Sequence, residues 1–353
     1  MNISVEKINK KIPNRYRKNT FSVNFLSFSY NLLALADRDF NKKLTDAVDI
    51  YKDTSVKRKK LKRDMVFEYV HSWVSPLEYA RYELFNKNRE ERSAYIPDHE
   101  ELAIFQKTKS NNTFPFSKYG RYLLFRDYFH RDVFCFSPDS SQDKGYREFI
   151  AENKAIVIKP IMGGKGHGVA LIDTKSVPSM EAFRNAYPGE WLLEEVICQG
   201  TELKQFHPNS VNTVRFVTGM DYQGQFHYLF ALFRTGRGGS VVDNVGSGGL
   251  IALIDMETGR ICSDAVRGTE WFERHPDTNI EFKGFQIPCW EELRSLVKEM
   301  HLSVPKQRIC GFDMAWTETG WDVVEVNPAP SLTSYQQLIG KGIRPFLKEI
   351  DII

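Results

Sequence analysis

The chain has 353 residues, 42% of them hydrophobic and 26% charged, with a formal net charge of +3. This length and apolar content predict a soluble globular protein of about two domains, large enough to bury a sizeable core. The five cysteines show no paired spacing, which argues against a disulfide framework or a zinc knuckle and favours a reducing, cytoplasmic location. The N-terminal sequence shows no pattern of a secretory signal.

Positive charge is concentrated at the front of the chain. Residues 1–112 hold 22 lysines and arginines against 15 aspartates and glutamates, and the remainder carries a net charge of −4. The densest basic run, 57–63, is typical of a solvated helix face, but it also suits an acidic polymer or a membrane surface. No nucleic-acid partner is expected, because no stacking-aromatic motif or recognition-helix pattern accompanies the run. The uncharged segment 20–36 is too short to span a bilayer, and we interpret it as a buried or partner-facing helix.

The spacing of apolar residues predicts a mostly helical region at 1–112 and a second domain at 113–353. From Met65 to Phe85, apolar side chains recur at intervals of three or four residues. The polar stretch 107–113 predicts a loop at the boundary, and the next helix is expected at 117–129 with Ser117 as its N-cap. Short β-rich runs beyond residue 155 predict an α+β domain with mainly antiparallel strands. The predicted strands are 155–158, 169–172, 191–193, 213–218, 226–233, 250–254, 309–316 and 321–326, with helices near 178–187 and 289–301.

Lys159 ends an apolar strand and precedes a loop rich in glycine. Its ammonium is a compact point charge suited to phosphate oxygens. The loop residues Gly163, Gly164, Gly166 and Gly168 allow positive φ angles that bring successive backbone amides toward an anion. Taken alone, the loop is equally compatible with a hairpin turn. A Walker loop is excluded because no lysine and Ser/Thr follow the final glycine, and no His-Arg-Asp or Asp-Phe-Gly motif of a protein kinase follows the loop.

Further polar side chains lie where a nucleotide and its substrate can be contacted. Glu195 at a strand end and Glu202 seven residues later are placed to meet adenine and ribose, although glutamates at such an edge are more often simply solvated. Arg215 lies in an otherwise apolar strand and needs an anionic partner, either in a structural salt bridge or in a substrate phosphoryl group. Glycine-rich connections suited to closing over a ligand carry Arg234, Arg237 and Asn244.

Two acidic residues near the C-terminus predict a metal site. Residues 311–316 and 321–328 have the pattern of two strands joined by a tight turn, which sets Asp313 and Glu325 side by side. Asn327 lies two residues beyond Glu325 and therefore on the same face. These are hard oxygen ligands of the kind magnesium prefers, and two neighbouring carboxylates repel each other without a cation. The set therefore predicts one or two magnesium ions bound with a nucleoside triphosphate.

In the order and spacing of these motifs, residues 113–340 resemble the ATP-grasp superfamily, and most closely its sugar-transfer-associated group. The resemblance implies an ATP-grasp fold, in which two α+β lobes clamp the nucleotide, preceded here by the mostly helical region. The first hundred residues show no counterpart of the usual N-terminal α/β lobe.

The resemblance also implies roles for particular residues. Lys118, Lys159 and the glycine loop match contacts to the ATP phosphates. Glu195, with Glu194 as the alternative, and Glu202 match the adenine-edge and ribose carboxylates. Arg215 resembles the arginine that steadies the transferred phosphoryl group. The implied magnesium ligands are Asp313, Glu325 and Asn327.

The expected activity is ATP- and magnesium-dependent carboxylate–amine ligation through an acylphosphate, with Lys159 and Arg215 offsetting the charge of the moving phosphoryl group. The group's name implies surface-polysaccharide biosynthesis, with a saccharide or small-molecule acceptor. Two alternatives stay open. One is a phosphotransferase acting on a sugar or alcohol hydroxyl, and the other is a non-catalytic nucleotide-binding partner of a membrane glycosyltransferase that docks through the basic region.

Overall fold

The computed structural model describes residues 38–52, 55–108, 114–138, 143–163, 167–239 and 248–353. The chain divides into two compact units, Met1–Glu100 and Glu101–Ile353. The residues at the predicted domain boundary, 109–113, and the predicted helix at 20–36 lie outside the described part of the chain. Within the described residues, no helix combines the length and the apolar character needed to cross a bilayer.

Short helices make up the described part of the first unit. They are α3 (Arg38–Asp49), α4 (Arg58–Ser72), α5 (Pro76–Arg81), the 3-10 helix η2 (Leu84–Asn86) and α6 (Arg89–Ser93). Their apolar faces share one core, which includes Leu44, Met65 and Tyr79. Capping boxes begin α5 and α6, at Ser75 and Asn88. The mostly helical character predicted for this region is therefore confirmed.

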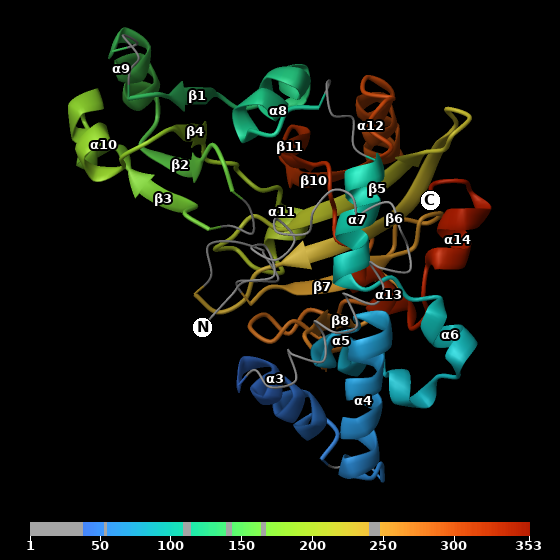
Figure 1. Ribbon diagram of the computed structural model, residues 1–353. Helices are drawn as coiled ribbons and strands as arrows, with labels where there is room; N and C mark the ends of the chain where they lie inside the picture. The colour runs from blue at the N-terminus through green and yellow to red at the C-terminus, as the bar shows by residue number, and fades with distance from the viewer. Residues whose placement is uncertain (1–37, 53–54, 109–113, 139–142, 164–166, 240–247) are drawn as a thin grey trace, which may run out of the picture. The chain divides into compact units, whose positions relative to one another are not determined.

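The second unit contains a four-stranded antiparallel sheet in the order β1-β4-β2-β3. Its strands are β1 (Val133–Phe136), β2 (Ala155–Pro160), β3 (Ala170–Asp173) and β4 (Trp191–Glu195). Figure 1 shows α9 (Asp143–Glu152) and α10 (Met180–Ala186) beside this sheet, and a core that includes Phe136, Tyr146 and Phe183 joins helices and strands. This sheet and its helices form the smaller α+β lobe.

A seven-stranded antiparallel sheet in the order β11-β10-β5-β6-β7-β8-β9 forms the larger lobe. Its strands are β5 (Thr213–Met220), β6 (Phe226–Thr235), β7 (Leu250–Ile254), β8 (Ala265–Arg267), β9 (Glu270–Phe272), β10 (Ile309–Thr317) and β11 (Gly320–Asn327). Leu293 and Val297 of α12 (Trp290–Leu302) share its main core with Phe216 and Phe312. The other helices of this unit are α7 (Asp98–Thr108, which begins in the first unit), α8 (Lys118–Phe125), η3 (Arg126–Tyr128), η4 (Thr174–Ser176), α11 (Thr201–Lys204), α13 (Thr333–Ile339) and α14 (Arg344–Glu349).

All eight predicted strands are present, most of them extended by one or two residues, and all pairings between the named strands are antiparallel. The helix predicted at 117–129 is α8 followed by η3, and the Ser117 side chain accepts a hydrogen bond from the backbone of Gly120, as expected of an N-cap. Short elements such as β1, β8 and β9 were not predicted, because runs of three or four residues carry too little periodicity.

Candidate nucleotide and metal site

Asp313 on β10 and Glu325 on β11 are direct cross-strand partners, so the predicted hairpin pairing is confirmed. Asn327, two residues beyond Glu325, lies on the same face and pairs with Gly311. On the other side of β10, Asp313 is the partner of Arg215 on β5. One row across three strands thus carries a carboxylate, a second carboxylate and a guanidinium.

Two arginines hold the buried carboxylate of Asp313. Arg215 donates from Nε to Oδ1 and from Nη2 to Oδ2, both at 2.7 Å, and Arg234 on β6 donates from Nη1 to Oδ2 at 2.9 Å. Burial by itself would raise the pKa of Asp313, but the two guanidinium charges outweigh it and lower the pKa to about 2. Arginines of this chain thus compensate the charge of Asp313, and the expectation that a magnesium ion accounts for the paired carboxylates stays a prediction.

The carboxylate and carboxamide oxygens of Asp313, Glu325 and Asn327 are the type of ligand that magnesium prefers. Asn327 donates from Nδ2 to Asp313 Oδ2 at 3.3 Å, so its carbonyl oxygen is the atom it can offer to a cation. The Glu325 side chain is 31% exposed, and its Oε1 lies 3.5 Å from Nη2 of Arg121. In the described part of the chain, no three His, Cys, Asp or Glu side chains could hold a metal ion together. A three-ligand site here would therefore take its third oxygen from a carboxamide, which suits magnesium.

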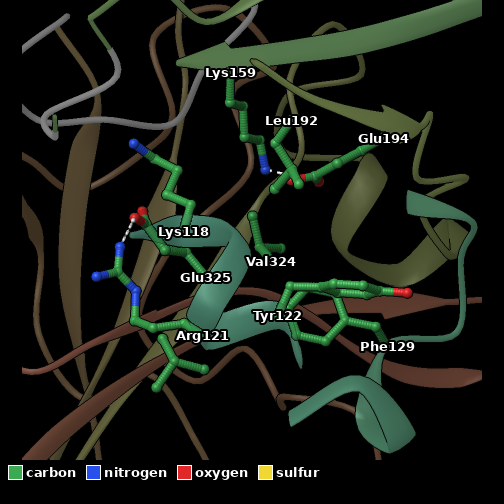
Figure 2. Close-up of a pocket in the computed structure, with 10 residues that line it drawn as sticks. Lys118, Arg121, Tyr122, Phe129, Lys159, Leu192, Glu194, Val324 and Glu325 are labelled. Carbon is green, nitrogen blue, oxygen red and sulfur yellow. Dashed lines mark hydrogen bonds and ion pairs between the residues drawn. The ribbon is translucent and has the colours of Figure 1, made fainter. Parts of the chain in front are cut away.

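Lys159 and Glu194 form an ion pair on the smaller sheet. Lys159 pairs with Leu192 across β2 and β4, which places Glu194 two residues along on the same face of β4. The Lys159 Nζ donates to Glu194 Oε2 at 2.8 Å, and the two side chains are 12% and 4% exposed. Figure 2 shows this pair across the pocket from Glu325. Lys159 and Glu325 line the same pocket, in which the Lys159 ammonium is directed at Glu194.

Lys118 opens α8 beside this pocket and contacts the glycine loop. Its backbone N–H donates to Ile161 O at 3.0 Å, and its Nζ donates to Pro160 O at 3.1 Å and to Gly163 O at 2.9 Å. Burial lowers the pKa of Lys118, although the charge of Glu325 opposes the shift. The pocket is lined by Lys118, Arg121, Tyr122, Phe129, Lys159, Leu192, Glu194, Val324, Glu325 and Val326 (Figure 2).

The glycine loop that follows β2 has the backbone angles that the sequence predicts at its two described ends. Gly163 has a φ angle of 108° and Gly168 a φ angle of 76°, a region that side chains strongly disfavour. Gly164 and Gly166 lie outside the described residues. At Gly168 a Cβ would also lie 2.7 Å from Cγ of Pro160, so Gly168 itself packs tightly against the strand that carries Lys159.

The neighbouring glutamates Glu194 and Glu195 point to opposite faces of β4. Glu194 is buried beside Lys159, whereas the exposed Glu195 accepts a hydrogen bond from the backbone N–H of Asp132 at 3.2 Å. The structure thus brings Glu194, the alternative in the sequence prediction, to the pocket instead of Glu195. Glu202 on α11 is exposed, and its Oε2 accepts from the indole Nε1 of Trp316 at 2.8 Å.

The two remaining predicted residues lie away from this pocket or outside the described chain. Arg237 follows β6 by two residues, and its guanidinium lies over the ring of Phe272, 5.6 Å from the centroid. No contact between Arg237 and the Asp313 row is found in the described residues. Asn244 belongs to 240–247, which the structure does not describe. Their assignment to substrate binding stays a prediction.

Two arginines of this site were not predicted from the sequence. Arg121 lies one helical turn after Lys118 on α8, a spacing that could have indicated a shared face. Arg131 is buried just before β1 and pairs with Glu194 and Asp322 at 2.7 and 2.8 Å. No local pattern indicates the partners of Arg131, because they lie 63 and 191 residues away along the chain.

The profile described as "Sugar-transfer associated ATP-grasp" matches residues 131–352, which is more than half of the chain. The second unit, with two α+β lobes and a pocket lined by residues of both sheets, therefore has an ATP-grasp fold, as predicted. The chain belongs to the sugar-transfer associated ATP-grasp family. Comparison with curated proteins gave no match.

The similar solved structures include two synthetases of low sequence identity. One is N5-carboxyaminoimidazole synthetase from Staphylococcus aureus complexed with ADP, with a TM-score of 0.40 and 12% identity over 64% of this chain and 47% of that chain. Another is D-alanyl-alanine synthetase A from Vibrio cholerae O1 biovar eltor str. N16961, with a TM-score of 0.42 and 14% identity over 67% of this chain and 63% of that chain. This chain thus spans less than two thirds of either protein. Similarity at this level does not indicate a shared substrate.

Proposed function

We propose that this protein is an ATP- and magnesium-dependent carboxylate–amine ligase that acts through an acylphosphate. The observation that carries the proposal is the register of Asp313 and Glu325, which gathers two carboxylates and Asn327 on one face beside Arg215. Lys159 on the smaller lobe and Glu325 on the larger lobe line one pocket. A polyphosphate bound between them would meet cations on both sides.

The residues of the pocket have distinct roles in this proposal. Lys118, Lys159 and the backbone of the glycine loop bind the phosphates, and the β4 edge with Glu202 orients adenine and ribose. Asp313, Glu325 and Asn327 would hold magnesium, which when bound neutralises charge on the phosphate oxygens. Arg215 and Arg234 lie on the side of Asp313 opposite Glu325 and stabilise negative charge that develops during phosphoryl transfer.

Catalysis in this scheme is positioning and charge neutralisation. The substrate carboxylate attacks the γ-phosphorus, the bond to the β-phosphate oxygen breaks, and ADP leaves. An amine then attacks the acyl carbon and loses a proton to solvent, and the acyl carbon–oxygen bond breaks so that inorganic phosphate leaves with one former carboxylate oxygen. The protein supplies no covalent nucleophile, and its oriented cations lower the barrier without reorganising at the moment of reaction.

An oxygen-label experiment tests this reaction. Purified protein is incubated with MgATP, candidate amines and ¹⁸O-labelled candidate carboxylates, and ADP, phosphate and products are analysed by mass spectrometry. We expect one ¹⁸O in the released phosphate and an amide product. A phosphorylated hydroxyl product without free phosphate would establish the phosphotransferase alternative instead. Nucleotide binding without turnover over the whole panel would favour the binding-module alternative.

We further propose a role in cell-surface polysaccharide biosynthesis, which the family description supports. The proposed location is the cytoplasm, and the proposed acceptor is a saccharide or a small molecule. The basic run of the first unit suits a polymer of this kind. It lines a groove of about 1500 Å³ that also includes Phe67, Tyr79 and Phe85. The five exposed cations of this groove are Lys57, Lys59, Lys60, Lys62 and Arg63.

Charge complementarity supports the proposal that an acidic saccharide chain binds in this basic groove. The one carboxylate that lines it, Asp64, accepts from Arg92 at 2.8 and 3.0 Å, so these two charges offset each other. In the described residues none of the five cations forms an ion pair of its own. Phe67 is 54% exposed and offers a flat apolar surface to a sugar ring.

A further inference from the structure

One carboxylate oxygen of Glu194 accepts hydrogen bonds from two cationic side chains, Lys159 and Arg131. Its Oε2 accepts from Lys159 Nζ at 2.8 Å, from Arg131 Nη2 at 2.7 Å and from Arg131 Nε at 3.1 Å. Burial would raise the pKa of Glu194, but the charges of Lys159 and Arg131 outweigh it, so the pKa is lowered and the carboxylate is ionised. Glu194 therefore shares its charge between a lysine and an arginine.

Arg131 is the fixed partner of the two. Its side chain is 4% exposed, and its Nη1 donates to Asp322 Oδ2 at 2.8 Å and to the carbonyl of Val323 at 2.6 Å. The other Asp322 oxygen accepts from the backbone N–H of His130 at 3.0 Å. These contacts tie the guanidinium to β11 of the larger sheet, so it has no freedom to leave Glu194. Arg131 thus joins β4 of one lobe to β11 of the other.

Lys159 is the exchangeable partner. In the described part of the chain its ammonium has one hydrogen-bond partner, Glu194, and it lies at the pocket that Lys118 and Glu325 also line. A four-carbon stem lets the ammonium reach a phosphate oxygen in that pocket. If it did so, Glu194 would keep its bonds to Arg131, and no buried carboxylate would be left unpaired.

We propose that Glu194 is an internal competitor of the nucleotide for the Lys159 ammonium, and that Arg131 is a positioning residue that weakens this competition by sharing the carboxylate. The inference rests on the proposed function, because it takes the competing ligand to be a nucleoside triphosphate. Glu194 then contacts Lys159 in the empty pocket and releases it to the phosphates. This role differs from an adenine contact, which would make Glu194 a direct ligand of the base.

The two roles predict opposite effects of Glu194→Gln, which removes the charge and keeps the shape. The full chain is titrated calorimetrically with the magnesium complex of β,γ-imido-ATP. We expect the variant to bind the nucleotide about five-fold more tightly, the order expected when one partly buried ion pair no longer has to break. Glu181→Gln, an exposed change on α10, is the matched control and should leave the Kd unchanged.

Two further variants identify the lysine and the arginine. With Lys159→Met the nucleotide should bind more weakly, and adding Glu194→Gln to it should no longer tighten binding, because the competed group is absent. Arg131→Lys should weaken nucleotide binding several-fold, since its ammonium cannot reproduce the fork of bonds and Glu194 then holds Lys159 more strongly. Restored affinity in Arg131→Lys with Glu194→Gln would show that the arginine acts through this carboxylate.

Weaker or unchanged binding by folded Glu194→Gln would overturn the inference, and a ten-fold loss would establish a direct nucleotide contact. If Arg131→Lys fails to fold, as thermal unfolding would show, the Glu194 and Lys159 variants decide alone. A wild-type chain that binds no MgATP analogue would instead refute the proposed function.

Discussion

Arg215 on β5 and Asp313 on β10 form a two-pronged ion pair, with both N–H···O distances at 2.7 Å. The pair lies in register across the sheet, next to Glu325 on β11. Arg215 therefore compensates a buried carboxylate and at the same time stands beside the proposed phosphate site. Substitutions of Asp313 and Glu325 should consequently differ in their effect on stability even though both stop catalysis.

Asp313→Asn should lower the free energy of unfolding by about 3 kcal/mol, because it removes a buried carboxylate charge that accepts hydrogen bonds from both Arg215 and Arg234. Glu325→Gln should change it by less than about 1 kcal/mol, since Glu325 is partly exposed and its nearest cation is 3.5 Å away. Urea unfolding followed by circular dichroism measures both. Both variants should lose magnesium-dependent ADP production. Equal stabilities would contradict the arginine-compensated state of Asp313, and unchanged ADP production would remove both residues from the mechanism.

Arg215→Lys should lower kcat by about 10²–10³-fold, because an ammonium cannot keep both bonds to Asp313 and face the transferred phosphoryl group as well. The KM for ATP should change less, since in the proposed site Lys118 and Lys159 also bind the phosphates. Steady-state ADP production gives both constants. Arg274→Lys is the control, because Arg274 forms an ion pair with Glu281 that is about half exposed. A loss confined to KM would mean that Arg215 only binds the ground state.

Trp316→Phe should raise the KM for ATP several-fold by removing the indole N–H that orients Glu202 at 2.8 Å. If Glu202 accepts from the ribose, wild type should prefer ATP over 2′-deoxy-ATP, and both Trp316→Phe and Glu202→Gln should reduce that preference. The measurement is kcat/KM for the two nucleotides. A wild-type protein that does not discriminate between them would remove Glu202 from the ribose site.

His301 should make the fold sensitive to mild acid. It is buried on α12, with Thr218 Oγ1 and Gln307 O each 2.6 Å from one of its ring nitrogens. Burial lowers its pKa to about 4 from an ordinary value of about 6.5. Between these values the unfolded chain binds a proton that the folded chain does not, so the free energy of unfolding should fall by about 3 kcal/mol as the pH drops from 6.5 to 4.

Denaturant unfolding at several pH values tests the role of His301. The His301→Gln variant should be less stable near pH 7 and should show a flatter pH dependence over the same window. Parallel curves for the variant and the wild type would show that the acid sensitivity arises elsewhere.

Charge reversal of the basic groove should abolish binding to an acidic saccharide. Lys59→Glu with Arg63→Glu places two anions one helical turn apart on α4, and affinity for polygalacturonate oligomers should fall at least ten-fold, with ATP affinity unchanged. Reversal of Lys144 and Lys348, on α9 and α14, is the charge-matched control. Binding of anionic lipid vesicles or single-stranded DNA in preference to the saccharide would overturn this assignment.

Much of the fold was predictable because its signals are local. The β10–β11 hairpin follows from two apolar runs around a Thr-Glu-Thr-Gly turn, and the register of Asp313 with Glu325 follows from the alternation of a strand. The cap at Ser117 and the positive φ angles at Gly163 and Gly168 likewise depend on residues within a few positions. The positions of the candidate metal ligands and of Lys159 on their strands were accordingly predictable from the sequence.

The partners of the buried charges could not be identified in this way. The sequence showed that Arg215 needs an anion, but only the order of strands β11-β10-β5-β6 brings Arg215 and Arg234 to Asp313. The alternation along β4 distinguishes Glu194 from Glu195 only when the face toward Lys159 is known. Arg131 meets Glu194 and Asp322 because two sheets approach each other there. Local propensity and periodicity determine the elements and their exposed faces, whereas ion pairs between distant strands depend on how the sheets pack, which no short stretch of sequence encodes.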